Sequence, residues 1–84
     1  MTAGMRLKMV TLYTREGCHL CDVAHEALVR VQARAPFALS IVDVDSDPAL
    51  VELYGWEVPV VLVDGKKVAK LRVDEDALLR RLNI

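Results

Sequence analysis

The fold is decided by the stretch Leu12-Tyr13-Thr14-Arg15-Glu16-Gly17-Cys18-His19-Leu20-Cys21, residues 12–21 of this 84-residue chain. Apolar and β-branched residues dominate residues 7–13, which predicts a buried strand. After a loop over residues 14–17, apolar residues recur at helical spacing as far as Val31, which predicts a helix that begins near Cys18. A pair of cysteines three positions apart is therefore expected to open a helix that directly follows a strand.

Downstream of this stretch, the sequence alternates between strands and helices. The first helix is expected to end before Ala35-Pro36, because proline disfavours helix in the residue before it. The further elements, in chain order, are a strand over 37–44, a helix over 48–54 with Ala49, Leu50, Leu53 and Tyr54 facing the core, a strand over 58–63, an exposed edge strand over 67–71 and a final helix after Asp74. Asp47 and Asp74 are suited to cap helices, and Asp64-Gly65 is typical of a hairpin turn.

The element order βαβαββα predicts an α/β fold with a four-stranded mixed sheet flanked by helices. The first two strands are joined by a helix and are expected to be parallel, whereas the last two form an antiparallel hairpin. In such sheets the functional crevice lies beyond the carboxyl ends of the parallel strands, where Cys18 follows the first strand. A single domain is expected over residues 1–84, with residues 1–5 disordered.

Composition argues against several classes of function. The chain carries 11 basic and 12 acidic side chains, so no surface for nucleic acid or for an anionic membrane is expected. It has neither an apolar run long enough to cross a bilayer nor the pattern of a signal peptide. A cytoplasmic monomer is expected. Because thiols are kept reduced in the cytosol, Cys18 and Cys21 are expected to be catalytic or metal-binding rather than a structural crosslink.

Three motifs resemble those of glutaredoxins and of the wider thioredoxin-like superfamily. The first is the quoted stretch, in which Arg15 stands where glutaredoxins have a basic residue before C-x-x-C. The second is Tyr54-Gly55-Trp56-Glu57-Val58-Pro59, because a Val-Pro step in this superfamily holds a cis-proline that faces the cysteines. The third is Asp64-Gly65, the turn of the final hairpin. The resemblance covers nearly the whole chain and implies a glutaredoxin-like form of the thioredoxin-like fold.

Two places depart from the glutaredoxin pattern. Glutaredoxins usually have a proline and then an aromatic residue between the cysteines, where this chain has His19-Leu20. They also have a Gly-Gly step after the last strand, before a residue that helps to hold glutathione, and residues 68–74 contain no glycine. Glutathione and a reductase are therefore both kept as candidate electron donors, and no bound cofactor is expected.

The resemblance implies a thiol–disulfide oxidoreductase that reduces disulfides in proteins or glutathione adducts. Exchange needs a thiolate, and the unpaired N–H groups at a helix start stabilise negative charge. Cys18 is expected to be the nucleophile, with a pKa below that of a free cysteine and with the charge of Arg15 nearby. Cys21, one turn further along, is expected to be more buried and to resolve the mixed disulfide.

The residues around the cysteines are candidates for substrate binding: Arg15, His19, Leu20, Trp56, Val58 and Pro59. The resemblance implies that Pro59 is cis and that Val58 offers its N–H and C=O to an extended substrate; the alternative is a simple strand-start proline. A charged His19 would stabilise the thiolate, or it is an exposed polar side chain. Trp56 either offers an apolar wall to a bound peptide or anchors its loop by partial burial.

A metal site or an iron–sulfur cluster bound by the same cysteines is the main alternative function. Cys18, Cys21, His19 and His25 are conceivable ligands, but a structural zinc site normally takes four ligands from two knuckles, and this chain has one C-x-x-C. His25 would have to turn back toward Cys21 and is interpreted as a surface histidine. No bound metal is expected. The cations of the final hairpin protect an edge strand or attract an anionic thiol: Lys66, Lys67, Lys70 and Arg72.

Overall fold

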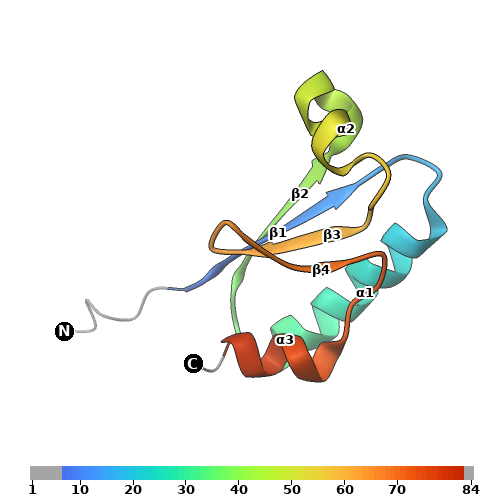
Figure 1. Ribbon diagram of the computed structural model, residues 1–84. Coiled ribbons are helices and arrows are strands. Elements are labelled where there is room, and N and C mark those ends of the chain that lie inside the picture. Colours follow the sequence, from blue (N-terminus) through green and yellow to red (C-terminus); the bar gives the residue numbers. More distant parts are fainter. Residues whose placement is uncertain (1–6, 83–84) are drawn as a thin grey trace.

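The computed structural model describes residues 7–82, so the expectation for residues 1–5 lies outside the described residues. Its elements, in chain order, are β1 (Met9–Thr14), α1 (His19–Arg34), β2 (Ala38–Asp43), the short 3-10 turn η1 (Val44–Ser46), α2 (Pro48–Tyr54), β3 (Val60–Val63), β4 (Lys66–Lys70) and α3 (Glu75–Leu82) (Figure 1). Apart from η1, this is the predicted order. Within residues 7–82, no helix combines the length and the apolarity needed to span a bilayer.

The four strands form one mixed sheet in the order β2-β1-β3-β4. β1 and β2 are parallel, whereas β3 is antiparallel to β1 and places Val60 opposite Tyr13. β4 is antiparallel to β3, with an irregular register between Val61 and Leu62. Since β3 runs against β1, the loop after β1 and the loop before β3 leave the sheet at the same end. The predicted four-stranded mixed sheet is confirmed, and it brings Cys18 and Pro59 to this end.

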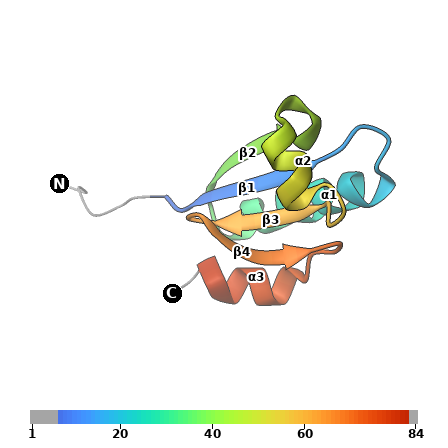
Figure 2. The same ribbon diagram turned by 45° about the horizontal axis from the view of Figure 1, so that its top comes forward.

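The apolar core lies between the sheet and two helices, α1 and α3, which lie together on one face (Figure 2). Side chains alternate along β1, so that Val10 and Leu12 are fully buried toward the helices. The central cluster consists of Val10, Leu12, Ala24, Leu28, Val31, Phe37, Val61, Val63 and Leu78. The apolar stripe predicted for the first helix is thus confirmed from Ala24 to Val31.

Helix α2 contributes none of its residues to the core. The prediction that Ala49 and Leu53 face the core is wrong, since both are exposed. The helix lies at the end of the sheet where β2 ends, away from α1 and α3 (Figure 1). Its Tyr54 instead stacks on Tyr13 of β1, with ring centroids 4.5 Å apart. Because Tyr13 alternates with Leu12 along the strand, this stack lies on the face opposite the core.

Three of the strands are shorter than the predicted segments, whereas β4 begins and ends one residue earlier than predicted and β1 extends to Thr14, which was predicted to lie in the loop. Leu7 and Lys8 precede the first paired residue of β1, and Val44 leaves β2 to begin η1. Val58 and Pro59 precede β3, and proline has no N–H to donate to a strand ladder. The paired segment is therefore defined by backbone hydrogen bonds and not by apolar character alone.

The predicted caps and the predicted turn are confirmed. An Oδ1 atom of Asp47 accepts the N–H of Ala49 at 2.9 Å, and that of Asp74 accepts the N–H of Ala77 at 3.1 Å. The turn residue Asp64 has a φ of 50° and its neighbour Gly65 a φ of 85°. Positive φ at both central residues is the geometry that two-residue hairpins favour.

Candidate functional site

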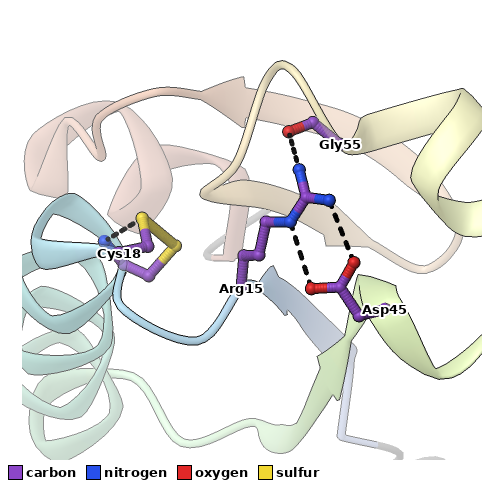
Figure 3. Close-up of a disulfide and its surroundings, with 5 residues drawn as sticks. Arg15, Cys18, Asp45 and Gly55 are labelled. Carbon is purple, nitrogen blue, oxygen red and sulfur yellow. Dashed lines mark hydrogen bonds and ion pairs between the residues drawn. A yellow bond between two sulfur atoms is a disulfide. The ribbon is translucent and has the colours of Figure 1, made fainter.

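Cys18 and Cys21 form a disulfide at the start of α1, with their Cα atoms 5.2 Å apart (Figure 3). Cys18 is the N-cap of the helix, and its Sγ accepts the backbone N–H of Cys21 at 3.1 Å. A negative charge on this sulfur would be stabilised by that N–H and by the positive end of the helix dipole. The prediction that the helix begins near Cys18 is confirmed, since α1 begins at His19.

The two cysteines differ in their access to solvent. Cys21 is 3% exposed and packs beneath the start of the helix, whereas Cys18 is half-buried. His19 and Leu20 lie between them and are both exposed, and Leu20 is not part of the apolar stripe that faces the core. A partner that approaches from solvent therefore reaches Cys18 before Cys21.

The turn that leads into Cys18 depends on Gly17, which has a φ of +80°. The turn is closed by the N–H of Cys18, which donates to the carbonyl oxygen of Arg15 at 3.1 Å. A Cβ atom built on Gly17 would meet nothing within 4 Å. Glycine is therefore favoured here by the backbone conformation and not by crowding.

The side chain of Arg15 points away from the disulfide (Figure 3). Its Nε and Nη2 atoms donate to the two carboxylate oxygens of Asp45, at 3.1 Å and 3.0 Å, and its Nη1 donates to the carbonyl oxygen of Gly55 at 3.2 Å. The guanidinium is thus paired with a carboxylate, and it ties the turn before Cys18 to η1 and to the end of α2.

Sequence reasoning missed the two partners of Arg15. The N–H of Asp45 donates to Oδ1 of Asp43 at 2.9 Å, which holds the backbone of Asp45 in η1 beside the turn. Gly55 is the C-cap of α2, with a φ of −54°. Glycine is favoured at position 55 for lack of space, because a Cβ atom on Gly55 would lie 2.5 Å from the carbonyl oxygen of Val51.

The loop that leads to β3 carries the other predicted contact residues. The Val58–Pro59 peptide bond is cis, as the resemblance implied, with Pro59 buried and Val58 half-buried. The carbonyl oxygen of Pro59 accepts the N–H of Leu71 at 2.8 Å. Trp56 is 91% exposed, so the alternative in which it anchors the loop by burial is wrong. Its role as a wall for a bound peptide stays a prediction.

Glu57 connects this loop to the final hairpin. Its carboxylate accepts hydrogen bonds from the Nζ atoms of Lys67 at 2.8 Å and Lys70 at 3.4 Å. The hydrogen bond from Lys67 is the main reason why the pKa of Glu57 lies below its ordinary value of 4.5. Two of the four cations predicted to attract an anionic thiol are thus already paired with a carboxylate.

A hollow of about 360 Å³ borders Cys21 on the side of β2. The side chain of His25 borders it as well, together with three carboxylates, those of Glu16, Asp22 and Asp43. Among the described residues, no group of three or more histidine, cysteine, aspartate or glutamate side chains is arranged to hold a metal ion.

Comparison with known sequences identifies relatives over most of the chain. The model of the glutaredoxin-like domain (DUF836) matches residues 9–83. Uncharacterized protein Rv0508 of Mycobacterium tuberculosis is 34% identical over 79 residues, which cover 88% of this chain and 81% of that protein. A glutaredoxin-like protein of Dictyostelium discoideum is 32% identical over 75 residues, which cover 82% of this chain and 69% of the relative.

Solved structures agree with this relationship. The solution structure of protein Ne2328 from Nitrosomonas europaea superposes with a TM-score of 0.82 at 29% identity, covering 93% of this chain and 94% of the other. The X-ray structure of protein XcR50 from X. campestris gives a TM-score of 0.74 at 37% identity, covering 88% of this chain and 95% of the other. A thioredoxin variant from Halobacterium salinarum shares the fold, with a TM-score of 0.67 at 24% identity over 93% of this chain and 74% of the other.

The geometry of the two cysteines and the comparisons support the same class of function. A C-x-x-C pair at the start of a helix, on a thioredoxin-like fold, supports a redox-type function. The chain belongs to the glutaredoxin-like domain family (DUF836).

Proposed function

We propose that the protein is a thiol–disulfide oxidoreductase that reduces disulfides in proteins or in small-molecule adducts, with Cys18 as the nucleophile and Cys21 as the resolving thiol. The observation that carries this proposal is the hydrogen bond from the N–H of Cys21 to the Sγ of Cys18. After reduction, the same donor would stabilise a Cys18 thiolate, which is the species that attacks a disulfide.

The assignment of the two roles rests on access to solvent. The Cys18 thiolate would attack one sulfur of the substrate disulfide, forming a mixed disulfide and releasing the first substrate thiol. Cys21, which is 3% exposed, would then attack Cys18, releasing the second substrate thiol and leaving the Cys18–Cys21 disulfide. Two electrons from a donor restore the dithiol and complete the cycle.

The surface around Cys18 supports a substrate that has an apolar portion. Leu20 lies at the start of α1 and is 50% exposed. Trp56 lies in the loop between α2 and β3 and is 91% exposed. Burial of these two apolar side chains against a substrate would be favourable. The electron donor is glutathione or a reductase. The pairing of Lys67 and Lys70 with Glu57 favours the reductase, because glutathione carries two carboxylates that need free cations.

The test is a reduction assay on a glutathionylated peptide, with either glutathione and glutathione reductase or a thioredoxin-reductase system as the donor. We expect turnover by the wild-type protein, no turnover by Cys18→Ser, and a trapped mixed disulfide with Cys21→Ser that mass spectrometry detects. Equal turnover by wild type and Cys18→Ser would contradict the proposal. Metal and sulfide analysis of protein purified without oxygen tests the alternative of a metal or cluster carrier.

A further inference from the structure

Neither Cys18 nor the loop that carries Pro59 is among the residues that line the hollow beside Cys21. Its walls come from the end of β1, from the turn before Cys18, from the first turns of α1 and from the end of β2. It is large enough to hold several water molecules.

The resolving step, which rests on the proposed function, requires that Cys21 lose a proton. Burial in apolar surroundings disfavours the thiolate form of a cysteine. Within residues 7–82, no charged side chain is buried, so a buried carboxylate of the described chain does not supply the base. On the core side the hollow is bounded by Leu12, which carries no titratable group. On this side of Cys21, the available acceptors are water and the side chains that border the hollow.

His25 is the bordering side chain best suited to accept this proton. It lies four residues after Cys21 on α1, and residues four apart occupy the same face of a helix. Side chains in a helix lean toward its N-terminus, which is the direction of Cys21 from His25. Both residues line the same hollow, and His25 is exposed to solvent, as the prediction of a surface histidine required.

A carboxylate is a weaker base than an imidazole. Three carboxylates border the hollow, those of Glu16 from the turn, Asp22 from α1 and Asp43 from β2. Arg15 is held by Asp45 and has no lone pair to offer. Imidazole, by contrast, accepts and releases protons near neutral pH. The carboxylates would also stabilise the imidazolium that forms when His25 takes the proton.

We propose that His25 is the proton acceptor for Cys21 in the resolving step. A ring nitrogen of His25 takes the proton from Sγ of Cys21, directly or through a water in the hollow. The Cys21 thiolate then forms a bond to Sγ of Cys18, and the bond between Cys18 and the substrate sulfur breaks. The electron pair leaves with the substrate sulfur, which takes up a proton from the imidazolium or from solvent.

The test measures the resolving step separately from the first attack. Reduced protein is mixed with a glutathionylated peptide, quenched in acid at successive times, and analysed by mass spectrometry for the mixed disulfide. The wild-type protein is compared with His25→Gln and with the control Glu26→Gln, which changes the adjacent exposed side chain outside the hollow. The first attack is measured alone in Cys21→Ser, with and without His25→Gln.

We expect the mixed disulfide to accumulate in His25→Gln near pH 7 because its resolving rate falls by about tenfold or more. This difference should vanish near about pH 9, where hydroxide deprotonates the thiol directly. The first attack and the control variant should match the wild type. Resolving rates within about twofold of each other at every pH would overturn the role of His25 while leaving the proposed function intact. Failure of the wild type and of Cys21→Ser to form any mixed disulfide would instead overturn the proposed function.

Discussion

Arg15 holds both carboxylate oxygens of Asp45, at 3.0 and 3.1 Å, across thirty positions of sequence. A third hydrogen bond, to the carbonyl oxygen of Gly55, extends the contact to the segment that leads to Pro59. One guanidinium therefore fixes the turn before Cys18 relative to two other loops at the same end of the sheet. In this structure Arg15 links these loops and is paired with a carboxylate.

Replacing Arg15 by lysine should uncouple these loops, because an ammonium group cannot make the paired contact with a carboxylate. The ion pair is partly exposed, so we expect Arg15→Lys to lower the free energy of unfolding by only about 0.5–1 kcal/mol. Urea titrations of Arg15→Lys, Asp45→Asn and the double variant check this. Strictly additive effects of the two substitutions would contradict a direct coupling.

The position of Cys18 at the helix start predicts the pH at which it reacts. In the reduced protein, its alkylation by iodoacetamide should follow a titration with a midpoint below about pH 8, lower than that of a free thiol. The measurement is made on Cys21→Ser, so that only one thiol reports. A midpoint at or above that of free cysteine would show that the N–H groups of α1 do not stabilise the thiolate.

Gly55 should tolerate a side chain poorly. A Cβ atom would lie 2.5 Å from the carbonyl oxygen of Val51, and the backbone of α2 would have to move. We expect Gly55→Ala to destabilise the protein by about 1–3 kcal/mol in thermal or urea unfolding. Gly65→Asn is the matched control, because that position has open space and asparagine accepts a positive φ. Equal stabilities of the two variants would contradict the clash.

The lowered pKa of Glu57 predicts a small loss of stability in acid. A carboxylate with a lower pKa in the folded state stabilises the protein above its unfolded pKa, and this contribution is lost as the pH falls through the folded value. The loss should therefore occur below about pH 4.5, the ordinary value for this group. Urea midpoints of wild type and Glu57→Gln should differ at pH 7 and converge in acid. A gap that widens as the pH falls would contradict the ion pairs with Lys67 and Lys70.

Local signals in the sequence were enough to predict the order of the elements and the C-x-x-C pair at the start of a helix. The helix that begins at Cys18, the caps at Asp47 and Asp74 and the hairpin turn all depend on residues within a few positions of one another. The contacts of Arg15 were not predictable in this way, because they depend on how η1 and α2 are placed in space. The exposure of α2 was missed for the same reason. Its apolar pattern is consistent with a core helix, but α2 lies at the end of the sheet, away from the core between the sheet, α1 and α3 (Figure 1).

Leu71 shows a further limit of local patterns. It has a φ of 69°, a conformation that favours glycine, and its N–H contacts the carbonyl oxygens of Glu57 at 3.2 Å and Pro59 at 2.8 Å. The chain thus makes the turn after β4 without the Gly-Gly step whose absence the sequence revealed. Neither the composition nor the periodicity of the sequence reveals that a residue such as Leu71 adopts an unfavourable backbone conformation.

β1 is a central strand of the sheet, and the turn that leads to Cys18 follows it. β1 is bonded to β2 on one side and to β3 on the other, so its amide protons belong to the part of the molecule that opens least often. The turn over residues 15–17 follows directly on this strand, and Cys18 and Cys21 lie beyond it at the start of α1. Exchange at the two sulfurs therefore breaks none of the hydrogen bonds that hold β1 in the sheet.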